Sequence, residues 1–170
     1  MLQSLHCGGA LLRGEVVVES GQGVARLLGR RLARRLGLPV TDGHCAFEVR
    51  IAHQDGALLW QRRFVNGGEL VSRFRPEGRF PHGSWFEQTG ALELELGVDI
   101  AGGGWYWILR RLRWQGRTLP RWLAPRLRAG KRIRDGAYEF EVAFSLPLLG
   151  PLLSYRGLLV PQMDAPAPAA

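Results

Sequence analysis

Three arginines fall on strand faces that are otherwise apolar, because side chains two residues apart point to the same side of a strand. A guanidinium in a dry interior is costly unless a carboxylate, carbonyl groups, water or a ligand neutralises it. Guanidinium also binds carboxylate or phosphate in a two-pronged geometry, so these positions suit an anionic ligand group. With the aromatic residues nearest to them in the pattern, the candidate ligand-binding residues are Arg62, Arg110, Arg156, Trp60, Tyr106 and Tyr155.

These arginines could also reach solvent in two ways that need no ligand. A β-bulge reverses the parity of every residue beyond it, and one bulge would turn an inward arginine outward. An arginine near a strand end can also run its stem along apolar surface and reach water. The clearest carboxylates of the pattern, Glu93, Glu95, Glu139 and Glu141, fall on predicted outer faces and so offer the arginines no partner.

Other chemistry is sparse. Two His-Cys pairs, His6-Cys7 and His44-Cys45, offer four metal-ligand types, but adjacent residues on a strand point to opposite faces and chelate poorly. We therefore expect no metal, no cofactor and two ordinary thiols. His82 lies in an expected loop near Trp85 and is the candidate for an acid or base in the weakest alternative, an enzyme of unknown chemistry. No nucleophile or phosphate-loop motif accompanies it, so we expect no catalytic residue.

The positioning elements are mostly strands. Alternating apolar residues separated by turn signals predict a mainly β (α+β) fold, an antiparallel barrel or strongly curved sheet of about eight or nine strands. The alternative, a helix-grip fold, needs a long C-terminal helix that the pattern does not contain. The expected strands span 14–20, 45–53, 58–65, 69–75, 91–100, 105–114, 126–134, 137–145 and a last run after Pro151.

One amphipathic helix is expected over 23–37, before Pro39. Leu28, Leu32 and Leu36 share a face with Ala25, and the arginines of the helix lie opposite. We predict one domain over residues 1–160 and a disordered tail over 161–170.

Positive charge is concentrated between residues 101 and 136, a segment that contains ten basic residues and one acidic residue, Asp135. This favours an anionic membrane surface or a protein partner. Nucleic acid is not expected, because alternation assigns several interleaved tryptophans to the core. The N-terminus has no secretory leader, so we expect a cytoplasmic protein, with a membrane-peripheral location as the alternative. The predicted basic surface comprises Arg26, Arg30, Arg34, Arg126, Arg128 and Arg132.

The C-terminal half contains a distinctive set of residues: Gly116, Leu119, Pro120, Leu123, Ala124, Pro125, Pro147, Gly150, Tyr155, Arg156 and Gly157. Through these residues it resembles a family of bacterial domains of unknown function. The resemblance implies a domain found alone or fused behind a saccharopine-dehydrogenase-like, NAD(P)-binding domain, in an accessory role without catalytic residues. Where such domains tend to carry acids before the Asp-Gly turn, this chain has Lys131, Arg132 and Arg134.

The leading functional prediction is a non-catalytic binding module for a small apolar or amphipathic molecule with an anionic head. It depends on aromatic residues converging inside the sheet and on the arginines among them. The alternative is a basic-surface protein-interaction or membrane-peripheral accessory domain that works with a separate oxidoreductase.

Overall fold

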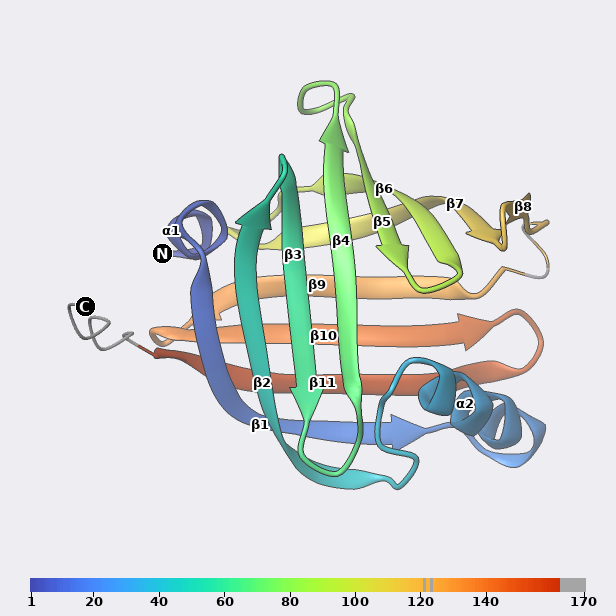
Figure 1. Cartoon of the computed structure of the whole chain (residues 1–170). Helices are drawn as coiled ribbons and strands as arrows, with labels where there is room; N and C mark the ends of the chain where they lie inside the picture. The colour runs from blue at the N-terminus through green and yellow to red at the C-terminus, as the bar shows by residue number, and fades with distance from the viewer. Residues whose placement is uncertain (121, 123, 163–170) are drawn as a thin grey trace.

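The computed structural model describes residues 1–120, 122 and 124–162, in which ten antiparallel strands close into a barrel (Figure 1). Neighbours around the barrel follow the order β6-β5-β4-β3-β2-β1-β11-β10-β9-β7, and pairing of β6 with β7 closes it. The strands are β1 (Ala10–Ser20), β2 (Gly43–Gln54), β3 (Ala57–Phe64), β4 (Glu69–Glu77), β5 (Ser84–Thr89), β6 (Leu92–Asp99), β7 (Trp105–Trp114), β8 (Arg117–Thr118), β9 (Arg126–Arg134), β10 (Ala137–Leu146) and β11 (Gly150–Gln162).

The predicted mainly β barrel is confirmed, with a slightly different strand count. Two strands were not predicted: β5, and the two-residue β8, which pairs with the end of β7 outside the barrel. The helix α1 (Leu2–Gly8) was not predicted either, whereas α2 (Gly23–Arg35) matches the predicted helix. Strand β11 runs to Gln162, into the predicted tail, and the rest of that tail lies outside the described residues.

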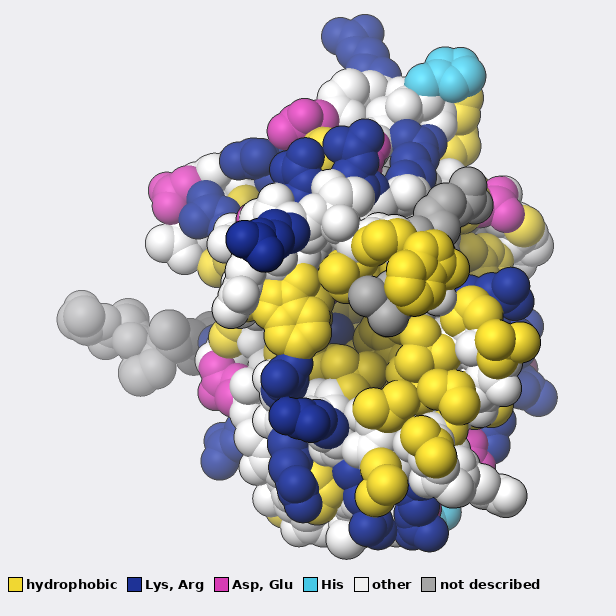
Figure 2. Space-filling view, turned by 90° about the vertical axis from the view of Figure 1, so that its right-hand side faces the viewer, with side chains coloured by type: hydrophobic (Ala, Val, Ile, Leu, Met, Phe, Trp, Pro, Cys, Tyr) yellow, Lys and Arg dark blue, Asp and Glu magenta, His cyan; other side chains and the backbone are white. Residues whose placement is uncertain are grey.

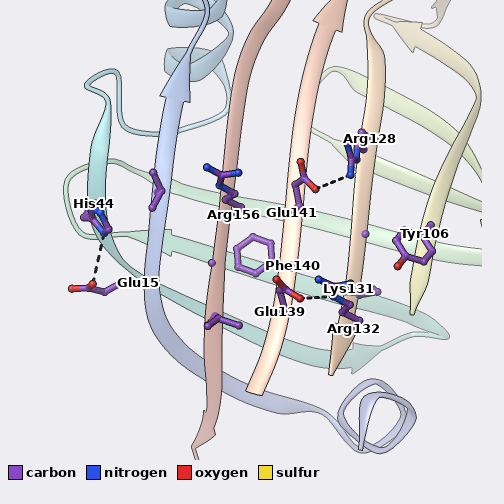
Figure 3. Close-up of a pocket in the computed structure, with 14 residues that line it drawn as sticks. Glu15, His44, Tyr106, Arg128, Lys131, Arg132, Glu139, Phe140, Glu141 and Arg156 are labelled. Atoms are coloured by element: carbon purple, nitrogen blue, oxygen red, sulfur yellow. Dashed lines mark hydrogen bonds and ion pairs between the residues drawn. The ribbon is translucent and has the colours of Figure 1, made fainter. Parts of the chain in front are cut away.

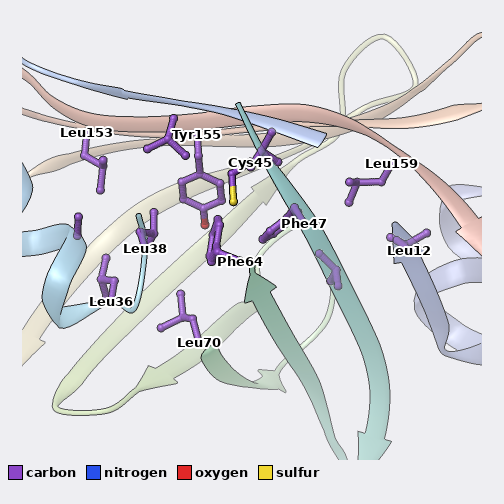
Figure 4. Close-up of a cluster of buried hydrophobic side chains, with 14 of the residues drawn as sticks. Leu12, Leu36, Leu38, Cys45, Phe47, Phe64, Leu70, Leu153, Tyr155 and Leu159 are labelled. Carbon is purple, nitrogen blue, oxygen red and sulfur yellow. The ribbon is translucent and has the colours of Figure 1, made fainter. Parts of the chain in front are cut away.

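Aromatic and aliphatic side chains pack together in the barrel interior (Figure 4). Ten strands enclose more space than the eight that aliphatic side chains fill easily. Phe47 occupies the centre of this cluster, with its ring centroid 4.5 Å from that of Phe64 and 5.4 Å from that of Phe140. Tyr155 meets the Phe64 ring edge-on at 5.6 Å. The predicted inward faces of β3 and β10 are therefore confirmed.

Helix α2 packs on the barrel through small residues and through most of the predicted face: Ala25 and, just after the helix, Leu36 are buried, and Leu32 packs against the core. Its buried face consists of Ala25, Gly29 and Ala33, which are four residues apart. A Cβ on Gly29 would lie 1.9 Å from the carbonyl oxygen of Leu152 in β11, so the helix backbone rests directly on the strand. Leu28 is the one residue of the predicted face that is exposed.

A β-bulge in β7 reverses its faces, which corrects the predicted core of this strand. Leu94 pairs with Leu112, but Leu96 pairs with Leu109, so Arg110 is the extra residue between them. Trp105, Trp107 and Leu109 therefore face inward before the bulge, and Leu112 after it. The prediction of an inward Tyr106, Ile108 and Arg110 is wrong for this reason.

Strand β11 also has the opposite parity from the prediction. Its inward residues are Leu153, Tyr155 and Leu159, which are almost completely buried. Leu158 and Arg156, which were predicted to face inward, point outward. The prediction failed because apolar residues occupy both faces of this strand, so the alternation does not show which face is buried.

Candidate functional site

A buried polar network lies inside the barrel around Arg62 of β3. Arg62 donates hydrogen bonds to the hydroxyl oxygen of Tyr155 at 3.1 Å and to that of Ser72. Its Nη2 lies 3.6 Å from the Glu87 carboxylate, which also accepts hydrogen bonds from Ser72 at 2.7 Å and Thr89 at 3.1 Å. Burial lowers the pKa of Arg62, but Tyr155 and Glu87 raise it by more, so the guanidinium stays charged.

Glu87 is a carboxylate that the sequence pattern did not place in the site. It comes from β5, which was not predicted, and its side chain is only 13% exposed. The alternation of Trp85, Glu87 and Thr89 before the turn at Gly90 is the signal that would have found it. Arg62 is thus inward as predicted, but a protein carboxylate neutralises it.

A second cation, Lys131 of β9, lies inside the barrel against three tryptophans. Its Nζ is 3.9 Å from the ring centroid of Trp60, 4.6 Å from that of Trp105 and 5.1 Å from that of Trp107. Burial, and then the charge of Arg62, hold the pKa of Lys131 well below its usual value, although Glu87 acts in the opposite direction. No described residue gives this amine a hydrogen-bond acceptor.

Lys131 does not belong to the solvated basic segment in which the sequence places it. On β9, Lys131 shares one face of the strand with Leu127, Ala129 and Ile133, because residues two apart point to the same side. This alternation would have predicted that Lys131 points into the barrel. The basic residues around it suggest a solvated strand, which is why its parity is easily overlooked.

Helix α1 brings His6 into the same end of the barrel. The His6 ring stacks on Trp105 at 5.4 Å and lies 5.5 Å from the Trp60 ring. Its Nδ1 donates to the Leu2 carbonyl oxygen at 2.7 Å, so the neutral ring keeps an unprotonated Nε2. Burial, followed by the charge of Lys131, lowers the pKa of His6 to about 4.

A small cavity of about 40 Å³ adjoins these groups inside the barrel. Arg62, Lys131, Trp60 and Trp107 contribute to its wall, together with the Tyr138 ring. A water molecule needs roughly 10–15 Å³ of such space, so the cavity admits about three non-hydrogen atoms. This cavity therefore has room for a small group and none for a drug-sized ligand.

A larger groove of about 590 Å³ lies on the outer face of β1, β11, β10 and β9 (Figure 3). Its charged side chains pair with one another across neighbouring strands. Arg128 lies 3.5 Å from Glu141, and Arg132 bonds to Glu139. Such exposed pairs contribute little to stability, but they leave these arginines already neutralised. An anionic ligand would have to compete with the protein's own carboxylates.

One end of the barrel opens as a hollow bordered by hydrophobic side chains, with basic side chains nearby (Figure 2). Helix α2, strand β8 and the β10–β11 turn lie on this side of the molecule (Figure 1). The exposed apolar residues of these segments and of the end of β7, together with Trp122 after β8, are here called the apolar rim: Val24, Leu27, Leu28, Trp114, Trp122, Leu148 and Leu149. Exposed apolar groups gathered in this way are typical of binding surfaces.

The structure separates the predicted ligand-binding residues. Arg62, Trp60 and Tyr155 meet inside the barrel. Arg110 is exposed and donates to Ser84 at 2.8 Å, and Arg156 is exposed with its Nη2 3.5 Å from Glu19. The remaining predicted residue, Tyr106, lies outside against Gly130.

The predicted basic surface is mostly exposed: this holds for Arg26, Arg34, Arg126, Arg128 and Arg132, whereas Arg30 is half-buried. His82 is exposed in the β4–β5 loop. Among the described residues, no group of three or more metal-ligating side chains comes together.

A family model described as "Domain of unknown function (DUF4166)" matches residues 1–159. The chain belongs to this family. A search of curated proteins gives no match to this chain.

The Tyr155-Arg156-Gly157 sequence of the DUF4166 domain follows from the packing of β11. Tyr155 accepts the hydrogen bond from Arg62 inside the barrel. A Cβ on Gly157 would lie 2.2 Å from the carbonyl oxygen of Glu15, so β11 approaches β1 more closely there than a side chain permits.

Neither described helix is long and apolar enough to cross a membrane.

Proposed function

We propose that the domain is a non-catalytic binding module for an amphipathic molecule with an anionic head, whose apolar part lies against the apolar rim. The observation that carries this proposal is the hollow end of the barrel, where exposed apolar side chains surround an opening (Figure 2). An apolar ligand that covers them removes apolar surface from water, at about 25 cal/mol for each Å².

Helix α2 provides one side of the site. Because its small residues pack on β11, its outer face presents Val24, Leu27 and Leu28 beside Arg31 and Arg35. A single helix face thus combines apolar groups with two guanidinium groups. That arrangement suits a molecule whose tail and anionic head lie close together.

The end of β7 provides a neighbouring side. The Arg35 guanidinium lies 4.5 Å from the ring centroid of Trp114, which places the end of α2 against the end of β7. Among the described residues, no carboxylate lies within ion-pair distance of Arg31 or Arg35. These two arginines differ in this respect from the paired arginines of the outer groove.

Thermal unfolding with fatty acids and their methyl esters tests the proposal. At a free concentration about 100 times the Kd, binding stabilises the folded state by about 2.7 kcal/mol, which raises the Tm by about 5–10 °C for a chain of this size. We expect Leu28→Glu to abolish the shift. We expect Arg35→Gln to weaken binding of the acid and to leave binding of the ester unchanged.

Matched controls lie on the outer wall of the barrel. Leu158→Glu and Arg50→Gln change exposed residues of the same types on β11 and β2, and both should keep the full shift. An unchanged Tm across the panel would contradict the proposal. A shift lost only in Leu158→Glu would move the site to the outer groove.

The apolar rim also favours a second candidate, docking on an anionic membrane surface. Leu148 is fully exposed at the tip of the β10–β11 turn and Trp122 is 74% exposed, which is typical of groups that enter the membrane interface. We expect co-sedimentation with vesicles that contain anionic lipid, weakened by salt and by Leu148→Glu. Equal binding to neutral vesicles would contradict electrostatic docking, and Leu158→Glu is the control.

Work beside a separate nicotinamide-binding oxidoreductase stays a prediction, supported by the family resemblance alone. A basic-surface protein partner likewise stays a prediction.

A further inference from the structure

Lys131 is placed unusually for a lysine that only stabilises the fold. It is 4% exposed, and its Nζ has no hydrogen-bond acceptor among the described residues. An ammonium group has three donors to satisfy, and the ring faces around it satisfy none of them by ordinary hydrogen bonds. Lysines with these surroundings are the ones that serve as amine nucleophiles.

His6 supplies a base beside this amine. The His6 ring and the Lys131 amine both contact Trp60 and Trp105, so the two groups share one aromatic enclosure. Nε2 of His6 is buried without a hydrogen-bond partner among the described residues, and the bond from Nδ1 to Leu2 leaves it as an acceptor. It is therefore an unoccupied proton acceptor in the wall of the same enclosure.

The adjoining cavity limits what can reach the amine. Its volume of about 40 Å³ suits a molecule of about three non-hydrogen atoms. Small molecules enter buried cavities of folded proteins through local opening, as benzene and xenon enter engineered ones.

We propose that Lys131 condenses with a short aliphatic aldehyde to form an imine inside the barrel, with His6 moving the protons. The amine nitrogen attacks the carbonyl carbon, and the carbonyl oxygen takes up a proton to give a carbinolamine. Loss of one water molecule then forms the carbon–nitrogen double bond. One aldehyde and one amine give one imine and one water, and no oxidant or reductant takes part.

The tryptophan faces favour the protonated imine over the ammonium group. A protonated imine spreads its charge over carbon and nitrogen and has a single N–H donor. The three indole rings around Nζ stabilise such a cation through their faces. The enclosure therefore suits the product better than the starting cation, which needs three acceptors.

Reductive trapping tests the proposal directly, because Lys131 is the only lysine of the chain. The folded protein is treated at pH 7 with acetaldehyde and cyanoborohydride, and the alkylated peptide is identified by mass spectrometry. We expect alkylation at Lys131 at least about tenfold faster than in the chain unfolded in urea, because each unit by which a lysine pKa falls raises the neutral amine about tenfold. His6→Gln should slow the reaction at Lys131, and Lys131→Met should leave only the N-terminal amine to react.

Size selectivity separates the cavity from surface chemistry. A long-chain aldehyde should alkylate the N-terminal amine and spare Lys131 in the folded protein. Alkylation of the folded protein at the N-terminus alone, or at Lys131 no faster than in urea, would overturn the proposal. No amphiphile is used and the apolar rim is not involved, so this result is independent of the fatty-acid experiment.

Discussion

Replacing Glu87 with leucine should lower the free energy of unfolding by about 3–5 kcal/mol, because it leaves the buried charge of Arg62 without its carboxylate. The same change removes the acceptor of the Ser72 and Thr89 hydroxyl groups. Urea unfolding measured for the wild type and the variant gives the difference. This is the largest single effect that we expect in the barrel, since every member of the network is buried or nearly so.

The double variant Arg62→Met/Glu87→Leu shows whether the loss is due to the unpaired charge. Removing both partners of a buried pair is often close to neutral, so the double variant should recover most of the stability. Glu77→Leu removes a carboxylate from an exposed pair with Arg75 on β4 and should cost no more than about 1 kcal/mol. Additive losses in the double variant would show that Arg62 and Glu87 are not energetically coupled.

The second large effect is a loss of stability in acid through His6. The pKa of His6 is about 4 in the folded protein and 6.5 in the unfolded chain, so between these values the unfolded state binds more protons. Stability from this group is present above pH 6.5 and is lost as the pH falls toward 4. The difference corresponds to about 3 kcal/mol.

Urea unfolding between pH 4 and 7.5 checks this prediction. The curve for His6→Gln should be flatter than that of the wild type by about this amount, whereas His82→Gln, in an exposed loop, should follow the wild type. Lys131 and His53 both act on His6 electrostatically, so Lys131→Met should move the His6 transition to higher pH. Parallel curves for His6→Gln and the wild type would contradict the assignment.

The barrel was predictable from the sequence because most of its strands alternate clearly. β3 and β10 each present one apolar face, and their inward residues, Trp60, Arg62 and Phe140 among them, were placed correctly. The faces of β7 were not predictable, since no local pattern marks Arg110 as the extra residue of a bulge. β11 is apolar on both faces, so parity alone could not orient Tyr155 and Arg156.

The polar interior was harder to predict than the fold. The carboxylate that neutralises Arg62 was missed because Glu87 lies on a strand of only six residues, over which the alternation of Trp85, Glu87 and Thr89 is a short signal. Lys131 was hidden by the neighbouring basic residues, although its parity was apolar. His6 enters the barrel from a helix of seven residues, too short to give a periodic signal.

Because Lys131 is buried, the positive charge of the protein surface cannot be changed by modification of lysine. Of the 23 basic residues, 22 are arginines, and the single lysine faces the barrel interior. Acetylation, methylation and ubiquitin transfer on lysine therefore find no exposed lysine side chain in the folded protein. Arginine also keeps its proton throughout the physiological pH range. The positive charge of this surface is consequently permanent, and neither lysine acylation nor a moderate change of pH can reduce it.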